Sequence, residues 1–235
     1  MIESREITHH IQKHIIGVLM YNEHARFRDL RPPKTDTNLF SYHLQSLLKM
    51  GVVAKSGEGY GLTRIGLAYV DRVSTEKMII RNQPKIITML VVQNSDGDVL
   101  LQRRRKQPYI NMWTLPYGKL HIDDATILAG AQREAKEKLQ LDDQPMTHAG
   151  DVYIRVSAGD DILSTTIAHV FRFDRDDITV DEHFQWVQPH TLSRYRLAPA
   201  VEHIVARCFF KDPYFFEEYD ERWESLAVDR VTSHQ

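Results

Sequence analysis

WTLPYGKLHIDDATILAGAQREAKEKLQL, residues 113–141, is the stretch of sequence that decides the fold. An extended segment turns at Gly118 and leads through a polar loop into one amphipathic helix. Asp123 or Asp124 can cap this helix, which we expect to extend from Ala125 to about Leu139. At about 100° per residue, its apolar side chains form one stripe that should face a core. The stripe consists of Ile127, Leu128, Ala131, Ala135 and Leu139.

Charged side chains follow one edge of that stripe. Glu134, Glu137 and Lys138 are three and four residues apart, so they project together, and Arg133 lies just beyond them. Two carboxylates on a helix edge, opposite a loop that turns at a glycine, can hold a divalent cation, and Mg²⁺ takes oxygen ligands. The alternative is a solvated charged face whose side chains pair along the helix.

The whole segment resembles the Nudix box. The family pattern is a glycine, five residues, Glu, seven residues, and then Arg-Glu-apolar-x-Glu-Glu-x-Gly-apolar. Gly118 matches the glycine, and Asp124 falls at the first Glu as a shorter carboxylate. The positions that match in the second half are Arg133, Glu134, Ala135, Glu137 and Leu141, and a Trp-x-Leu-Pro lead-in is present as Trp113 to Pro116.

The chain also departs from this pattern. Eight residues separate Asp124 from Arg133, Lys138 replaces the second Glu of the pair, and Gln140 replaces the glycine that ends the helix. The resemblance implies catalytic roles for Arg133, Glu134 and Glu137. It also implies a Mg²⁺ site made by Glu134 and Glu137 with help from Asp124. Lys138 repels a divalent ion and can instead pair with Glu134 or with a substrate phosphate, which weighs against full hydrolytic activity.

Composition and length place the chain among ordinary globular proteins. Its 235 residues suit one large or two modest domains, and the sequence has no apolar run long enough to span a bilayer. The first ten residues, MIESREITHH, lack the apolar core of a signal peptide. A single cysteine, Cys208, excludes an internal disulfide, and its apolar helical setting predicts a buried thiol. We therefore expect a cytoplasmic protein that does not interact with membranes.

Charge is distributed unevenly along the chain. Residues 1–83 contain 12 Lys and Arg against 8 Asp and Glu, whereas residues 84–235 contain 18 against 24. A mildly basic front and an acidic back suggest two domains with different partners. We place the boundary near Pro84, with one domain over residues 1–82 and the other over residues 83–235.

Three helices followed by a hairpin are predicted for the first domain. The helices should cover residues 6–20, 25–30 and about 37–50, and the hairpin residues 52–62, before a further helix over residues 63–73. This outline, and especially FSYHLQSLLKMGVVAKSGEGYGLTRIG, resembles the winged helix-turn-helix family. Leu39, Leu44, Leu47 and Leu48 form the expected apolar side of the third helix.

The opposite side of the third helix is polar and carries the predicted DNA contacts. Asn and Gln can read adenine edges, while Lys and Tyr suit guanine or phosphate. The candidates are Asn38, Tyr42, Gln45 and Lys49 on the helix and Lys55 on the hairpin. The alternative is that this module makes protein contacts or a homodimer, because an exposed helix face is polar in any soluble domain.

The second domain is predicted to contain a strand pair over residues 86–92 and 99–103, and later strands over residues 151–156, 164–173 and 182–187. Arg103 and Arg105, within a basic run, can meet a pyrophosphate or can be solvated surface. Glu182 is either an accessory carboxylate or a rim residue. A closing helix is expected over residues 199–210, and a last helix within residues 209–223.

We thus expect an α/β (α+β) protein with an N-terminal winged helix-turn-helix and a C-terminal Nudix α/β/α sandwich. The first functional hypothesis is a dimeric transcription regulator that binds double-stranded DNA. Its Nudix domain would sense a nucleoside diphosphate derivative resembling ADP-ribose, through Arg103, Arg105, Gly118, Lys138 and Glu182. The second hypothesis is a Mg²⁺-dependent Nudix hydrolase that cleaves a nucleoside diphosphate linked to another moiety.

Overall fold

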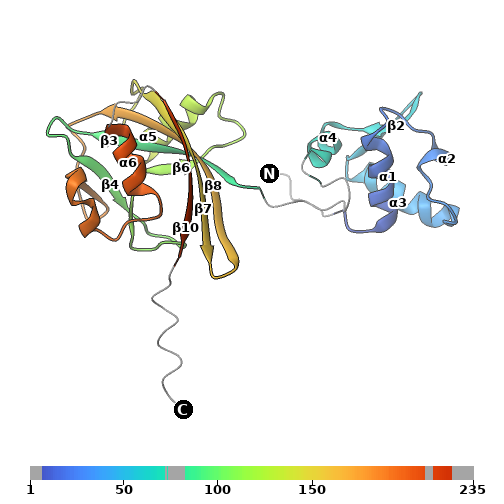
Figure 1. Ribbon diagram of the computed structural model, residues 1–235. Coiled ribbons are helices and arrows are strands. Elements are labelled where there is room, and N and C mark those ends of the chain that lie inside the picture. Colours follow the sequence, from blue (N-terminus) through green and yellow to red (C-terminus); the bar gives the residue numbers. More distant parts are fainter. Residues whose placement is uncertain (1–6, 72, 74–82, 210–213, 224–235) are drawn as a thin grey trace, which may run out of the picture. The chain divides into compact units, whose positions relative to one another are not determined.

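The computed structural model describes residues 7–71, 73, 83–209 and 214–223. The chain divides into two compact units, Met1–Asn82 and Gln83–Gln235 (Figure 1). Each unit has its own buried apolar cluster.

The N-terminal unit has an order of elements compatible with a winged helix. Its helices and hairpin strands are α1 (His10–Met20), α2 (Phe27–Leu30), α3 (Thr37–Lys49), β1 (Val53–Ser56), β2 (Gly59–Leu62) and α4 (Arg64–Val70). The α3 helix begins where it does because the Asp36 carboxylate accepts hydrogen bonds from the backbone N–H groups of Asn38 and Leu39. The Thr63 hydroxyl caps α4 in the same way, by accepting from Gly66.

The apolar side of α3 differs by one residue from the expected set. Leu44 and Leu47 are buried as predicted, but Leu39 is 46% exposed and Phe40 is fully buried instead. Residues 40, 44 and 47 are separated by helical spacing, so they share a face, while residue 39 is rotated away by about 100°. Phe40 also meets the Phe27 ring edge-on at 4.8 Å, which anchors α2 against α3.

The C-terminal unit is built around one mixed sheet. Along its main path the strand order is β10-β7-β8-β3-β4-β5, with β6 paired to β3 and β9 paired to β4. The strands are β3 (Lys85–Gln93), β4 (Val99–Arg103), β5 (Trp113–Thr114), β6 (Tyr117–Lys119), β7 (Thr147–Ala158), β8 (Asp161–Asp174), β9 (Phe184–Val187) and β10 (Phe215–Arg222). The helical segments are α5 (Ile127–Leu139), η1 (Pro189–Arg194) and α6 (Val201–Phe209).

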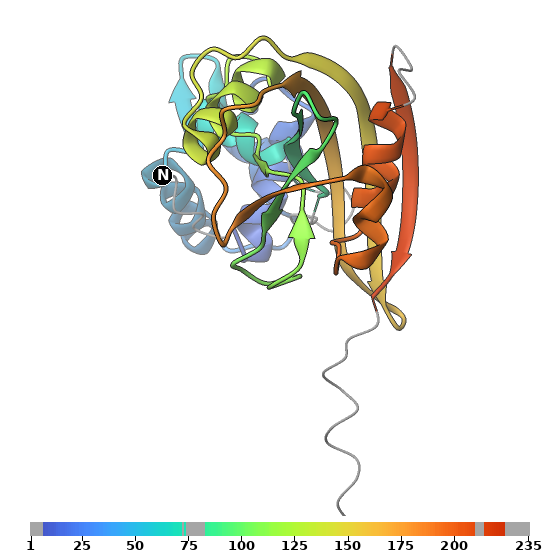
Figure 2. The ribbon, with the colours of Figure 1, turned by 90° about the vertical axis from the view of Figure 1, so that its left-hand side faces the viewer.

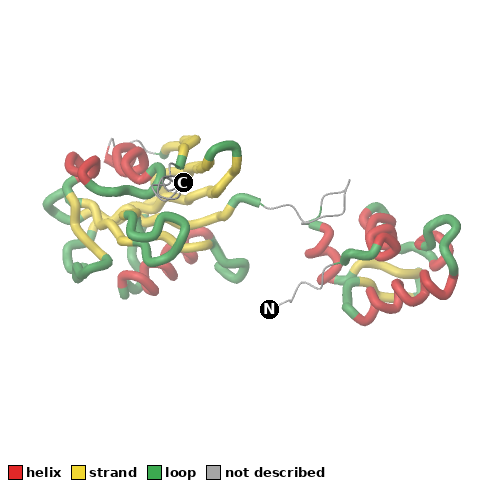
Figure 3. The backbone as a smooth tube through the Cα atoms, turned by 90° about the horizontal axis from the view of Figure 1, so that it is seen from below, coloured by secondary structure: helices red, strands yellow, loops and turns green. Residues whose placement is uncertain are grey.

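Both faces of this sheet are covered, and Figure 3 shows helices above and below the strands. Alternate residues of β3 account for the two layers. Leu90 packs in a cluster with Ala131 and Ala135 of α5, whereas Met89 packs in a second cluster with Ile204 of α6. Because β3 is buried on both sides, its sequence is mostly apolar and does not alternate with polar residues. The result is an α/β/α sandwich.

The box helix α5 starts later than predicted. Thr126, and not Asp123 or Asp124, caps it, since the Thr126 hydroxyl accepts a hydrogen bond from the N–H of Ala129 at 3.0 Å. Ile127 and Leu128 lie in the first turn and are partly exposed, at 36% and 39%, so the buried stripe begins only afterwards. At the other end, Gln140 adopts the left-handed backbone conformation that glycine usually provides.

The predicted last helix within residues 209–223 is wrong. Phe215–Arg222 forms strand β10, which pairs in parallel with β7, and Figure 2 shows it as the red strand at the sheet edge. Burial alternates along it from the buried Phe215 to the exposed Arg222, which is the period of a strand.

Among the described residues, none of the helices has both the length and the apolar character that a membrane span requires.

Candidate functional site

Arg133 is the centre of the charged edge of α5. Its guanidinium donates two hydrogen bonds of 2.9 Å to the Asp124 carboxylate, one from Nε and one from Nη2. Its Nη1 donates to Glu134 at 2.7 Å and to Glu137 at 3.4 Å, and its Nη2 also reaches the Lys119 carbonyl at 2.9 Å. One cation therefore engages all three carboxylates that were predicted to bind metal.

Asp124 is fully engaged in this arrangement. Both of its oxygens accept from Arg133, and one of them also accepts from the backbone N–H of His121 at 2.7 Å. The hydrogen bonds from Arg133 and His121 hold the pKa of Asp124 well below its usual range. The carboxylate thus ties the loop before α5 to the helix.

Glu134 lies against the glycine of the box. Its side chain is only 5% exposed, and its second oxygen is 3.8 Å from the ammonium of Lys138. A Cβ at Gly118 would lie 1.7 Å from the Glu134 carboxyl carbon, so only glycine permits this approach. The predicted turn at Gly118 is wrong, because this residue lies within strand β6 and pairs with Thr88. Its expected proximity to the acidic edge of the helix is present.

These carboxylates do not fit a Mg²⁺ ion in this arrangement. Magnesium requires close to octahedral oxygen coordination and is usually held by one or two free carboxylates with several waters. Here Asp124 and Glu134 are neutralised by Arg133 and Lys138, and releasing either carboxylate would leave a partly buried cation without its partner. Glu137, 55% exposed, is the most accessible of the three.

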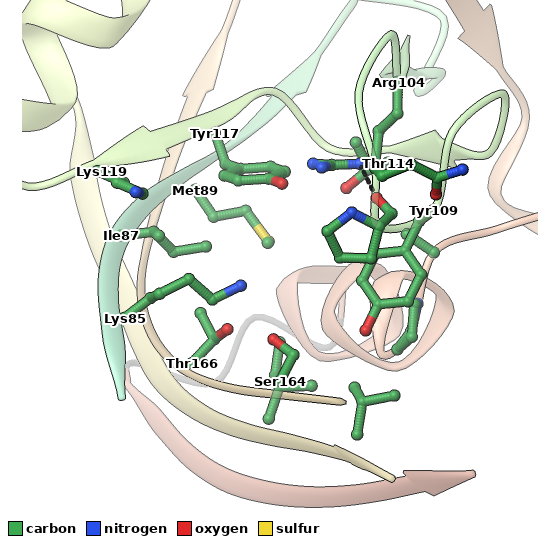
Figure 4. Close-up of a pocket in the computed structure, with 16 residues that line it drawn as sticks. Lys85, Ile87, Met89, Arg104, Tyr109, Thr114, Tyr117, Lys119, Ser164 and Thr166 are labelled. Carbon is green, nitrogen blue, oxygen red and sulfur yellow. Dashed lines mark hydrogen bonds between the residues drawn. The ribbon is translucent and has the colours of Figure 1, made fainter. Parts of the chain in front are cut away.

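A cavity of about 260 Å³ opens on the other face of the sheet (Figure 4). Its floor includes Ile87 and Met89, which alternate along β3 with the residues that pack against α5. The rest of the wall comes from β6, β7, β8, the loop that follows β4, and Ala198 and Pro199 before α6. Tyr117 and Lys119 line the cavity, while Gly118 between them faces Glu134. Strand β6 thus separates the box carboxylates from the cavity.

Three cations line this cavity, namely Lys85, Arg104 and Lys119. None of the described residues that line it is acidic. Burial lowers the pKa of Lys85, and the positive charges of Arg104 and Lys119 lower it further. Figure 4 shows the Lys85 amino group pointing into the space between the two tyrosines and β8. The cavity therefore has an excess of positive charge that suits an anion.

Arg104 is fixed in place by the loop that follows β4. Its Nε donates to the Pro108 carbonyl at 2.9 Å, and its guanidinium lies 5.2 Å from the Tyr117 ring centroid and 5.9 Å from that of Tyr109. Tyr109 itself has a φ of 69°, a left-handed conformation that is strained for a bulky residue. The loop therefore holds a cation between two aromatic rings at the cavity wall.

A second hollow of about 330 Å³ adjoins the first and shares Arg104, Thr114 and Tyr117 with it. Its other lining residues are Gln102, Arg103, Arg105, Lys106 and Lys138. Lys138 thus faces a cationic hollow as well as Glu134. Glu182 lines a third hollow with Arg103 and Arg105, and none of the box carboxylates lines it.

The sequence-predicted site residues of the C-terminal unit therefore fall into two groups. Asp124, Arg133, Glu134, Glu137 and Gly118 meet on the α5 side of the sheet, while Arg103, Arg105 and Glu182 lie around the hollows near the end of β4. Sequence reasoning missed Lys85, Lys119 and the aromatic residues of the cavity. The available signal was the alternation of β3 and β6, which turns Lys85 to the side of Ile87, and Lys119 to the side of Tyr117.

The candidate DNA contacts of the N-terminal unit are exposed. Asn38, Tyr42, Gln45 and Lys49 lie on the surface of α3, opposite the buried Leu44 and Leu47. Lys55 is exposed on β1, where its amino group lies 5.7 Å from the centroid of the Tyr60 ring.

Several solved structures resemble this chain. The NUDIX domain of Shewanella oneidensis NrtR complexed with ADP ribose has 15% identity and a TM-score of 0.48, covering 64% of this chain and 99% of that one. A MutT protein from Methanosarcina mazei Go1 has 23% identity and a TM-score of 0.46, covering 56% and 99%. A mutator MutT protein from Bacillus halodurans has 17% identity and a TM-score of 0.48, covering 58% and 89%.

No curated protein matched this chain. The sequence profile of the NUDIX domain, in contrast, matches residues 83–208, which is more than half of the sequence. That range includes β6, the box helix α5 and all the described residues that line the cationic cavity. The chain belongs to the Nudix family.

Proposed function

We propose that this chain is a DNA-binding transcription regulator whose Nudix domain senses a nucleoside diphosphate derivative similar to ADP-ribose. The observation that carries this proposal is the contrast between the two sides of β6. On one side three cations line a cavity whose described lining residues include no carboxylate, and on the other side the box carboxylates are engaged by Arg133 and Lys138.

The cations supply the diphosphate recognition. Lys85, Arg104 and Lys119 line one cavity, and charged donors bind phosphate oxygens more strongly than neutral ones. Burial lowers the pKa of Lys85, and the positive charges of Arg104 and Lys119 lower it further, so an anion in this cavity would offset their mutual repulsion. A diphosphate group is therefore the chemistry that the cavity favours.

The apolar and aromatic walls supply the rest of the recognition. Tyr109 and Tyr117 offer ring faces, and Ile87 and Met89 offer apolar surface beside the cations. Ligand sites typically combine such walls with a few well-placed polar groups. A base or a sugar ring attached to a diphosphate matches this combination.

The ion pairs of the box residues support sensing without hydrolysis. Metal-assisted hydrolysis needs carboxylate oxygens that are free to hold the ion. Arg133 engages Asp124, Glu134 and Glu137, and Lys138 adds a second cation next to Glu134. We therefore expect ligand binding that does not depend on Mg²⁺.

In this proposal the exposed face of α3, with Lys55 on the adjoining hairpin, contacts double-stranded DNA. Two copies of the chain would read the two halves of a palindromic site. For the ligand to regulate binding, it must have unequal affinity for the DNA-competent and DNA-incompetent arrangements.

A calorimetric titration of the full chain with ADP-ribose tests the proposed ligand binding. EDTA is present, so that binding without a metal ion is measured. We expect saturable binding, weakened about tenfold or more in a Lys85→Gln, Lys119→Gln double variant, because each charged hydrogen bond is worth about 1.5–3 kcal/mol. The matched control is Arg194→Gln, an exposed residue of η1 outside the three hollows described here. Equal affinity of the double variant and the control would refute the cavity as the binding site.

The hydrolase hypothesis retains specific support from the family match and from the close approach of Gly118 to Glu134. Incubation of the full chain with ADP-ribose and Mg²⁺, followed by chromatography of the products, separates the two hypotheses. The sensor proposal predicts intact ADP-ribose. Hydrolysis of ADP-ribose over multiple turnovers, stopped by EDTA, would refute the sensor proposal and support the hydrolase hypothesis.

A further inference from the structure

A second cluster of titratable side chains lies on β7 and β8. One oxygen of Asp151 is 2.8 Å from Nε2 of His148 and 2.7 Å from Nδ1 of His169. The side chains of His148, Asp151 and His169 are 35%, 23% and 15% exposed, so they are sheltered but accessible. None of them lines the cationic cavity or contributes to the α5 cluster.

A β-bulge brings these residues to one face of the sheet. In a regular strand, residues three apart point to opposite faces, so His148 and Asp151 would be separated. The register shifts between His148 and Gly150, which leaves Ala149 as an extra residue. Asp151 is then directly opposite His169, and His148 is opposite Phe171, which shares a face with His169.

The start of β10 completes the surroundings of Asp151. The Tyr214 hydroxyl donates to the second Asp151 oxygen at 2.6 Å. Tyr214 reaches this point because its neighbour Phe215 pairs with Gly150, where a Cβ would lie only 2.4 Å from the Phe215 carbonyl oxygen. An outer hydrogen bond of this kind orients a metal-binding carboxylate.

We propose that His148, Asp151 and His169 form a binding site for a divalent first-row transition metal ion, with Zn²⁺ as its natural probe. Two imidazole nitrogens and one carboxylate oxygen are a ligand set that suits such ions, and they leave further coordination positions open. The three ligand atoms lie within 4.8 Å of one another, and this is the only such group of three among the described residues.

Two of the three separations between ligand atoms need only a small adjustment to accept the ion, and the two imidazole nitrogens already lie within 4.8 Å of each other. Tetrahedral Zn²⁺ with bonds of about 2.0–2.1 Å keeps its ligand atoms roughly 3.3 Å apart. The two hydrogen bonds to Asp151 need to lengthen by only about half an ångström. Each imidazole then gives its lone pair to the ion and carries its proton on the other ring nitrogen.

The partners of Asp151 distinguish this cluster from the carboxylates of α5. Asp124 and Glu134 are paired with the permanently charged Arg133, which a metal ion cannot displace without exposing an unpaired cation. Asp151 is paired with histidines, and a neutral imidazole is itself a common metal ligand. The site would also join β7 and β8 to the start of β10 through Tyr214.

Isothermal titration of the full chain with Zn²⁺ tests the proposal. We expect one ion per chain at this site, and loss of that binding in Asp151→Asn and in His169→Gln. The affinity should fall by at least about 100-fold, because losing an outer partner alone costs roughly 10- to 100-fold. Tyr214→Phe, which removes only the outer hydrogen bond, should fall in that smaller range.

Two controls identify the site. His190→Gln removes an exposed histidine of η1 and should leave Zn²⁺ binding unchanged. A His9→Gln, His10→Gln variant removes two neighbouring imidazole rings of the N-terminal unit and should also keep Zn²⁺ bound in the C-terminal unit.

A second experiment uses the unaltered chain and does not depend on the folding of the variants. Bound Zn²⁺ should protect His148 and His169 from modification by diethylpyrocarbonate, which mass spectrometry measures at each residue. Absence of that protection, or Zn²⁺ binding retained in Asp151→Asn, would overturn the proposal.

Discussion

Lys138 is the residue that most sharply separates this chain from the family pattern. Its ammonium lies 3.8 Å from Glu134 and faces a hollow lined by Arg103, Arg105 and Lys106. A positive charge at a position that otherwise carries a metal ligand opposes divalent cations and favours anions in the same space.

Lys138→Glu should therefore raise the affinity of the chain for Mn²⁺ or Mg²⁺. The change removes a cation next to Glu134 and adds a carboxylate to the edge that holds Glu137. Titration calorimetry measures the effect. Lys136→Glu is the matched control, since Lys136 is exposed on the same helix but pairs with Asp142. Identical metal affinity in the two variants would show that position 138 does not belong to a metal site.

At the scale of single residues, the sequence predicted the box residues on one side of β6 but not the cavity cations on the other side. Gly118, Arg133, Glu134 and Glu137 are linked by fixed spacing within one motif, so their proximity could be predicted. Lys85 and Lys119 come together only through the register of β3 against β6, in which Ile87 pairs with Lys119. Such pairing between separate strands is not encoded in local periodicity.

The α5 helix is fastened at its start by a loop as well as by its cap. Asp124 precedes the helix, yet it binds Arg133 in the second turn and the N–H of His121 in the loop. The depressed pKa of Asp124 means that this carboxylate stabilises the folded state when it is ionised.

Asp124→Asn should lower the free energy of unfolding of the Nudix domain at pH 7 by about 1.5–3 kcal/mol, the range for hydrogen bonds to charged groups. A carboxylate with a depressed folded-state pKa contributes stability above its unfolded pKa, and this contribution is lost as pH falls towards the folded value. The difference between the parent chain and the variant should therefore shrink below about pH 4.

Urea unfolding at pH 7 and pH 3 measures this difference. Asp123→Asn is the matched control, because Asp123 is exposed and adjacent in sequence. A difference that stays constant between the two pH values would contradict the assignment of the effect to Asp124 ionisation.

At the scale of elements, strong local signals predicted β3, β4, α3 and the body of α5. They did not predict β10, which binds β7 in parallel across more than 60 residues of sequence and whose aromatic and acidic residues have no distinctive local pattern. The start of α5 was misjudged because Asp123, Asp124 and Thr126 are all good capping residues, and the choice among them depends on the partner of Asp124.

At the scale of the whole molecule, the chain combines a basic N-terminal unit with an acidic C-terminal unit. The N-terminal unit carries the candidate DNA contacts, and the C-terminal unit contains the cationic cavity. The sequence predicts a boundary near Pro84, because the balance of charged residues changes there. The sequence did not predict the cavity, because its lining residues come from six separate segments of the chain.

DNA binding by the front unit should show a strong dependence on salt. Lys49→Ala should weaken binding to all fragments similarly and reduce the slope of log affinity against log salt concentration by about one. Fluorescence anisotropy with labelled fragments of the promoter of the protein's own operon measures this slope. Lys13→Ala, on α1 and outside the set of candidate DNA contacts, should leave it unchanged. Equal slopes in both variants would remove Lys49 from the interface.

Strand β6 places three consecutive side chains on two surfaces with different chemistry. Gly118 faces Glu134, while Tyr117 and Lys119 face the cavity. Because neighbouring side chains of a strand point to opposite faces, substitutions on α5 need not disturb the residues on the other face of β6. In the proposed function, the residues at the edge of α5 can therefore change while the anion-binding cavity on the other face of β6 stays the same.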